Sequence, residues 1–197
     1  MKVAFDENMP AAMVRVFNLF HQERSLRHIV QGVEIERAKD YTPDPKDTDH
    51  KPKTDVPWIR RYAAAGGRII VSGDVRMSSV PHERLALVEE GMIVVFFAPK
   101  WDNWQFCRKA ALLLHWWPTI LAHVRKSAPG FFAVPCAWPD EGEGELREIS
   151  TDDRKLIKIQ RQIAEREQKR QARKAKREKA TSASQMGMFN ETQDDGN

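Results

Sequence analysis

The sequence is short of cysteine and has no long apolar run. Only two of its 197 residues are cysteines, Cys107 and Cys136. They are too few for a disulfide scaffold and lack the spacing of metal ligands, as do the six histidines. The longest apolar run, residues 92–98, covers seven residues, whereas a membrane helix needs about 20. The first residues contain no apolar signal-peptide core. These absences exclude membrane-spanning, disulfide-rich secreted and zinc-finger proteins, and they predict a cytoplasmic protein without a membrane partner.

Basic residues are abundant but concentrated in one segment. Residues 154–179 contain 12 Lys or Arg and three Glu, whereas residues 1–153 contain 20 basic and 22 acidic residues. Two interpretations of the basic segment remain open. It is either a solvated helix face or a surface whose cations neutralise the phosphates of a nucleic acid. The candidate phosphate contacts are Lys169, Arg170, Arg173, Lys174 and Arg177.

Short apolar runs alternate with helical patterns in the first two thirds of the chain. The runs predict strands over residues 2–5, 27–33, 68–72, 92–98 and 131–134. Helices are predicted to begin near Pro10, Pro57, Pro81 and Asn103. Strands that alternate with helices favour an α/β fold, here a three-layer sandwich with a mainly parallel sheet. Residues 40–55 are rich in Asp, Lys and Pro, which predicts an irregular loop.

The composition divides the chain into four parts. The α/β domain is expected to span residues 1–139. An acidic, glycine-containing linker is expected at 140–151, a basic helical extension at 152–180 and a disordered tail at 181–197.

Aspartates follow the predicted strands. Asp6 ends the first strand, Asp74 ends the strand 68–72, and Asp102 lies four residues beyond the strand 92–98. Asp55 precedes the helix that begins at Pro57. Because parallel strands end at one edge of a sheet, we expect at least Asp6 and Asp74 to converge there. Each aspartate has an alternative role as a turn or helix-capping residue.

Gathered carboxylates repel one another unless a cation compensates. Oxygen ligands suit Mg²⁺ or Mn²⁺, and such an ion can activate water for phosphodiester hydrolysis. Asp6, Asp55 and Asp74 are therefore the candidate ligands and catalytic residues. Asp102 is a candidate fourth ligand, and Asn8 and Ser72 are candidates for supporting hydrogen bonds.

Two stretches of the sequence resemble PIN-like domains. The first is VAFDENMP at residues 3–10. The second contains Asp55, the helix start at 58–61 and GRIIVSGD at 67–74. A tryptophan-rich segment after the third main strand (Trp101, Trp104, Trp116, Trp117) resembles the VapC-type toxin group of this family.

The resemblance implies a function for these residues. It implies a Mg²⁺- or Mn²⁺-dependent nuclease, usually an endoribonuclease, often the toxin of a bacterial toxin–antitoxin pair. Asp6, Asp55 and Asp74 match the family's acidic positions. RNA would then be the substrate and a cognate antitoxin a partner. Family members carry a further acid after the Ser-x-Asp strand, where this chain has Arg76, Ser78 and Glu83.

The C-terminal tail contains a second resemblance. Gln185, Met186, Met188 and Phe189 form a pattern similar to the bacterial sliding-clamp binding motif, so a sliding clamp is a candidate partner. This motif and the basic helix support the alternative function, a non-catalytic adaptor associated with nucleic acid or with the clamp.

Overall fold

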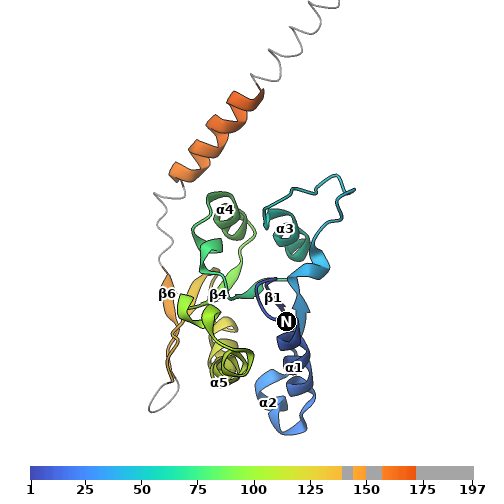
Figure 1. The fold of residues 1–197 in the computed structure, drawn as a ribbon, viewed down its shortest axis with the longest axis vertical. Helices are drawn as coiled ribbons and strands as arrows, with labels where there is room; N and C mark the ends of the chain where they lie inside the picture. The colour runs from blue at the N-terminus through green and yellow to red at the C-terminus, as the bar shows by residue number, and fades with distance from the viewer. Residues whose placement is uncertain (139–143, 150–156, 172–197) are drawn as a thin grey trace, which may run out of the picture. The chain divides into compact units, whose positions relative to one another are not determined.

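The first part of the chain is built around a six-stranded sheet (Figure 1). The computed structural model describes residues 1–138, 144–149 and 157–171, and the chain forms two units, Met1–Asp152 and Asp153–Asn197. In the sheet the strand order is β2-β1-β3-β4-β5-β6. The first five strands in this order are parallel, and β6 is antiparallel to β5. The strands are β1 (Lys2–Phe5), β2 (Glu34–Arg37), β3 (Ile69–Ser72), β4 (Ile93–Phe97), β5 (Gly130–Val134) and β6 (Arg147–Ile149).

Helices cover both faces of the sheet, which confirms the predicted three-layer α/β sandwich (Figure 1). One face carries α1 (Ala11–Gln22), α2 (Arg27–Val30) and α5 (Phe106–Val124), and the other carries α3 (Val56–Ala64) and α4 (Pro81–Glu89). Short 3₁₀ helices complete the element list: η1 (Arg24–Leu26), η2 (Ala38–Tyr41), η3 (Val75–Ser78) and η4 (Pro99–Asn103).

The central strands supply apolar side chains to both layers. Successive side chains of a strand point to opposite faces. Val3 and Phe5 of β1 therefore belong to the core under α1 and α5, whereas Ala4 lies in the core under α3 and α4. All four residues of β3 and all five of β4 are buried. This burial on both faces explains why these strands are recognisable in the sequence as continuous apolar runs.

The predicted second strand, residues 27–33, is wrong. This stretch contains α2, and the strand lies later, at β2. Ile29 and Val30 do pack against the core, but from a helical turn. Strand β2 is at the edge of the sheet and carries one apolar residue, Ile35, among charged ones. Charged side chains are common on edge strands because they prevent pairing with another chain, and they also hide the apolar signal of a strand.

The stretch 140–151, interpreted as a linker, contains strand β6. Its three residues, Arg147 to Ile149, pair with Phe131 to Ala133 of β5. The first compact unit therefore extends to Asp152 rather than to residue 139. A charged three-residue edge strand has too few apolar side chains to stand out from an acidic spacer. Of the loop predicted at residues 40–55, residues 42–55 contain no helix or strand, whereas Asp40 and Tyr41 form the end of η2.

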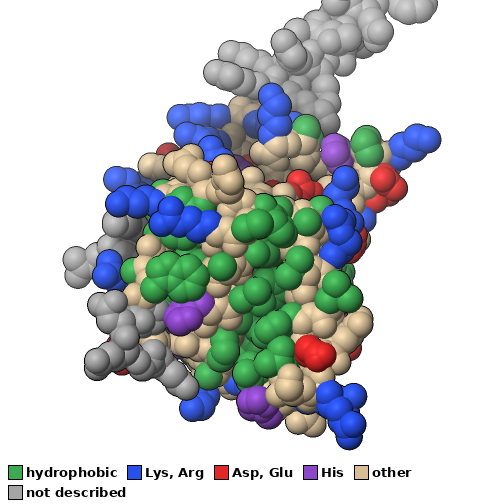
Figure 2. Space-filling model, turned by 60° about the horizontal axis from the view of Figure 1, so that its bottom comes forward, with side chains coloured by type: hydrophobic (Ala, Val, Ile, Leu, Met, Phe, Trp, Pro, Cys, Tyr) green, Lys and Arg blue, Asp and Glu red, His purple; other side chains and the backbone are tan. Residues whose placement is uncertain are grey.

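The face of the domain formed by α1, α2 and α5 exposes apolar side chains. Figure 2 shows them gathered on this side of the molecule, with Lys and Arg around them. Leu19 of α1 is 66% exposed, and Val16, Phe20 and Leu114 are only partly buried. None of the helices within the described ranges is both long and apolar enough to cross a membrane.

The second unit is described only over residues 157–171, which form a helix. Lys169 and Arg170 are exposed on it. Arg173, Lys174 and Arg177 lie outside the described residues, as do the tail residues Gln185, Met186, Met188 and Phe189.

The strand order changes direction at β1. After β1 the chain forms β2 on one side of it, and then β3 to β5 on the other side. Ligands of open α/β sheets bind at such a switch point, beyond the carboxyl ends of the strands. The crevice between the ends of β1 and β3 is therefore the expected site.

Candidate active site

Asp6 lies at this switch point and is almost fully buried, with 3% of its surface exposed. Its Oδ1 accepts a 2.7 Å hydrogen bond from the Glu7 amide. Its Oδ2 accepts bonds of 3.0 Å from Asn8 Nδ2 and 2.7 Å from Ser72 Oγ. Burial raises the pKa of Asp6, these three donors oppose the increase, and the nearby Asp74 charge adds to it. The residues Asn8 and Ser72 thus hold the carboxylate in one orientation.

Ser72 connects Asp6 to Asp74. It is fully buried at the end of β3. Its Oγ donates to Asp6 and accepts a 2.9 Å hydrogen bond from the Asp74 amide. Because β1 and β3 are paired in parallel, with Phe5 opposite Val71, the residues that follow them emerge side by side. The two strand-end acids therefore lie at the same edge.

The turn between these two residues requires glycine at position 73. A Cβ atom added at Gly73 would lie 2.8 Å from Cζ3 of Trp101. Trp101 is fully buried and stacks on Phe97, with ring centroids 4.8 Å apart. The indole of Trp101 consequently packs directly against the backbone that places Asp74.

The Asp74 carboxylate is bound by Arg76. Oδ1 accepts bonds from the Arg76 amide at 2.8 Å and Nε at 2.9 Å, and Oδ2 accepts from Nη2 at 2.7 Å. The guanidinium group holds the pKa of Asp74 below its usual value. Asp74 thus caps η3, the alternative role considered for it, while remaining at the edge where the site is expected.

Asp55 lies at the N-terminus of α3, but its side chain makes no capping hydrogen bond. Burial raises its pKa to about 6, and the charges of Glu83, Asp6 and Glu7 add to the increase. The Trp58 indole N–H faces this carboxyl and lowers the pKa. The contact falls short of hydrogen-bond geometry, so the buried Trp58 Nε1 has no acceptor among the described residues.

Glu83 of α4 is an acid that the sequence analysis did not select. Its side chain is buried, and its Oε1 accepts a 3.3 Å hydrogen bond from the Asp55 amide. Burial raises its pKa, and the Asp74 and Asp6 charges contribute. Glu83 occupies the part of the sequence where the family carries a further acid. The sequence feature that could have identified Glu83 is an acid in the first turn of the helix that follows the Ser-x-Asp strand.

Asp102 does not join these acids. Its side chain is 66% exposed on η4, and Oδ1 lies 3.6 Å from Lys109 Nζ in an ion pair. The structure therefore gathers four acids, Asp6, Asp55, Asp74 and Glu83, from four different parts of the fold. We call these four residues the acidic group.

The acidic group has the donor chemistry of a divalent-cation site. It offers only carboxylate oxygens, which Mg²⁺ and Mn²⁺ prefer. Burial raises the pKa of Asp6, Asp55 and Glu83, and the charges of neighbouring acids add to the increase. As the side chains stand in residues 1–138, 144–149 and 157–171, no three His, Cys, Asp or Glu are close enough to hold an ion. A cation at Asp74 would have to displace the Arg76 guanidinium.

The comparison with protein families covers all four of these acids. A family model described as a PIN-like domain matches residues 1–99. No curated protein and no solved structure matches the chain. The matched region runs from β1 to the end of β4 and excludes Asp102. The chain therefore belongs to the PIN-like domain family, whose members are typically metal-dependent nucleases.

Proposed function

We propose that this protein is a Mg²⁺- or Mn²⁺-dependent endoribonuclease of the VapC toxin type. The observation that carries the proposal is the acidic group at the switch point between β1 and β3. Four acids belong to this group, at the ends of two strands and the starts of two helices. Acids that are placed close together and removed from water destabilise the fold. A bound cation would relieve their repulsion, which would explain why the chain has acids at these positions.

Asp6, Asp55, Asp74 and Glu83 would hold the metal. When bound, a divalent ion activates water and neutralises charge on the phosphodiester. The residues of the chain provide orientation. Ser72 and Asn8 hold Asp6 Oδ2, and the Glu7 amide holds Oδ1. The Asp55 amide donates to Glu83, which fixes one acid relative to the next.

RNA as the substrate and an antitoxin as a partner are the finer parts of the proposal. Support comes from the family resemblance and from the apolar face over α1, α2 and α5, since exposed apolar patches are commonly covered by protein partners. Expression of the chain with and without the neighbouring open reading frame tests this part. We expect growth arrest only in the absence of the neighbouring gene.

A cleavage assay tests the enzymatic function. Single-stranded RNA and DNA oligonucleotides are incubated with the full chain in Mg²⁺, in Mn²⁺ and in EDTA. We expect metal-dependent cleavage of RNA, which Asp6→Asn and Asp74→Asn abolish because an amide cannot supply the charge that holds the ion. Asp44→Asn, an exposed acid of the 42–55 loop, is the matched control and should cleave normally.

The assay also separates the nuclease from the non-catalytic adaptor. Cleavage that persists at full rate in Asp6→Asn and Asp74→Asn would remove the acidic group from the mechanism. A wild-type chain that binds nucleic acid without cleaving it in either metal would favour the adaptor function.

A further inference from the structure

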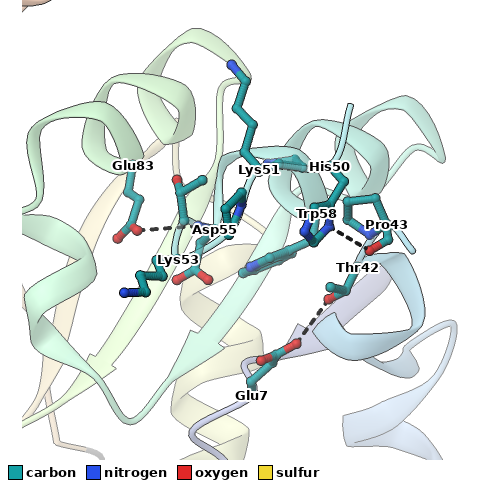
Figure 3. A pocket seen from close by; sticks show the side chains of 12 residues that line it. Glu7, Thr42, Pro43, His50, Lys51, Lys53, Asp55, Trp58 and Glu83 are labelled. Carbon is teal, nitrogen blue, oxygen red and sulfur yellow. Dashed lines mark hydrogen bonds between the residues drawn. The ribbon is translucent and has the colours of Figure 1, made fainter. Parts of the chain in front are cut away.

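A cavity of 270 Å³ lies beside the acidic group, beneath the loop of residues 42–55 (Figure 3). Asp55, Trp58 and Glu83 line it together with residues of the loop. The loop is attached to α3 through Arg61, whose guanidinium donates to Asp49 at 2.6 and 2.8 Å and to Asp47 at 2.7 Å. The cavity thus has a defined roof next to the proposed catalytic carboxylates.

Trp58 lines this cavity with a hydrogen-bond donor that faces the Asp55 carboxyl without reaching hydrogen-bond geometry. The side chain is 2% exposed, and its Nε1 has no acceptor among the described residues. In Figure 3 the indole extends beside Asp55 within the lining. A buried N–H without a partner destabilises the fold, so a ligand with an acceptor atom at this position would supply the missing hydrogen bond.

Two cations of the loop also line the cavity. Neither Lys51 nor Lys53 forms an ion pair with any residue that the structure describes. Lys53 has a φ of 61°, a left-handed backbone conformation that is uncommon outside glycine. Figure 3 shows its side chain extended toward the acids, whereas that of Lys51 extends away from them. The lining therefore contains two lysine charges beside the carboxyl groups of Glu7, Asp55 and Glu83.

The lining selects the type of ligand. Pro43, Pro57 and the Trp58 ring provide apolar walls, and the volume suits one flat ring system with its substituents better than a larger ligand. Apolar and aromatic walls with cations at the rim are typical of sites for unpaired nucleotides. A base that is paired and stacked in a duplex cannot enter such a cavity.

A second hollow continues the same surface. It has a volume of 310 Å³ and is lined by Asp6, Glu7, Arg37 and Lys39, among others. Glu7 lines both hollows. A single-stranded nucleic acid with one nucleotide in the first cavity would thus also contact Asp6, Arg37 and Lys39 in the second hollow.

We propose that the cavity beneath the 42–55 loop binds one unpaired nucleotide of the substrate, with a base acceptor at Trp58 Nε1 and phosphates at Lys51 and Lys53. This inference rests on the proposed nuclease function and assigns the position of a nucleotide next to the cleaved bond. The cavity would then make the enzyme selective for single strands.

Binding measured in EDTA tests the inference, because metal-dependent cleavage cannot occur there. The probe is a fluorescein-labelled single-stranded hexaribonucleotide, titrated with the full chain at several salt concentrations. Lys51→Gln/Lys53→Gln should lose about 1.4 units of slope in log affinity against log salt, at about 0.7 for each phosphate contact. Trp58→Phe should bind about tenfold more weakly, the loss expected for one buried hydrogen bond.

Lys46→Gln is the matched control, since Lys46 is an exposed lysine of the same loop that does not line the cavity. It should leave affinity and slope unchanged. Trp58→Phe should change the melting temperature of the free chain only slightly, because the contact of its N–H with the Asp55 carboxyl falls short of hydrogen-bond geometry. Unchanged slope in the lysine variant together with unchanged affinity in Trp58→Phe would overturn the subsite.

Cleavage by the wild-type chain in Mg²⁺ is scored separately. If the wild type cleaves but the variants bind normally, the subsite is wrong and the nuclease function stands. If the variants bind weakly but the wild type does not cleave, the nuclease function is wrong and the nucleotide site stands.

Discussion

The Ser72 hydroxyl donates a 2.7 Å hydrogen bond to Oδ2 of Asp6, so that the last residue of β3 holds the carboxylate that follows β1. Both partners are buried. Ser72→Ala should therefore destabilise the fold by about 1–3 kcal/mol, since it leaves a buried charged acceptor short of a donor. Urea unfolding at pH 7.5 measures this loss. Ser72→Thr keeps a hydroxyl and should retain most of the stability, whereas equal losses in both variants would indicate a packing effect.

Asp55 gives the stability of the fold a pH dependence. Its pKa is raised to about 6 in the folded chain, whereas it is about 3.9 in an unfolded chain. The folded state binds the Asp55 proton more tightly than the unfolded state does. The protonated carboxyl therefore contributes its full stabilisation of the fold below about pH 4, and this stabilisation is lost as the pH rises through about 6. The pKa values of Asp6 and Glu83 are raised as well and act in the same direction.

Asp55→Asn should remove part of this dependence. We expect it to stabilise the metal-free chain by about 1 kcal/mol at pH 7.5, after allowing for the solvent-exposed part of the side chain, and to have little effect at pH 4. Urea unfolding at the two pH values, in EDTA, provides the measurement. Stabilisation of the same size at both pH values would contradict the raised pKa.

Glu83 should be as important for activity as the acids at the strand ends. Glu83→Gln keeps the side-chain volume but loses the charge, so metal-dependent cleavage should fall at least about a hundredfold, a typical loss on removal of one catalytic electrostatic group. Glu89→Gln is the control, because Glu89 lies on the same helix and forms an exposed ion pair with Arg60. Similar rates for the wild type and Glu83→Gln would exclude Glu83 from the site.

Arg76 should compete with the metal for Asp74. Arg76→Ala removes the side-chain donors to both carboxylate oxygens and leaves only the backbone amide of residue 76 on Oδ1. We expect Mn²⁺ to bind about twofold to fivefold more tightly, the range of an exposed ion pair. Calorimetric titration of Mn²⁺ into the full chain measures the constant. Weaker binding in this variant would show that Arg76 supports the site instead.

The basic segment of residues 154–179 should control affinity for long nucleic acids. If about four of the 12 cations in residues 154–179 contact phosphates, a chain that ends at Asp153 should lose roughly three units of salt slope on single-stranded RNA. Charge reversal at Lys169, Arg170, Arg173, Lys174 and Arg177 should have the same effect and keeps the apolar residues of the helix. Cleavage of a short substrate at saturation should survive. An unchanged slope would assign the helix to a protein partner or to solubility.

The parts of the fold that sequence reasoning predicted are those whose apolar pattern is strong. Strands β1, β3 and β4 are buried on both faces, so their sequences are continuous apolar runs. Strands β2 and β6 lie at the two edges of the sheet. Their stability comes from backbone pairing with a neighbour, which leaves little trace in the side chains. The helix at residues 27–30 illustrates the ambiguity of a short apolar pair, because Ile29 and Val30 suit either element.

The residues of the candidate site also divide into those that the sequence identifies and those that only the packing of the fold decides. Asp6 and Asp74 could be selected because the position of a residue at the end of a parallel strand follows from the sheet alone. Whether Glu83 or Asp102 joins them depends on how α4 and η4 pack against the sheet. Glu83 is turned inward toward the Asp55 amide, and Asp102 is turned outward toward Lys109. These orientations depend on tertiary packing, which no local pattern specifies.

The contact between Gly73 and Trp101 limits which substitutions this chain tolerates. A side chain at position 73 would collide with an indole that is itself enclosed by the core, so a larger residue at 73 is tolerated only when Trp101 is also replaced. A smaller residue at 101 opens room for a side chain at 73, but it also removes the wall against which the turn to Asp74 is built.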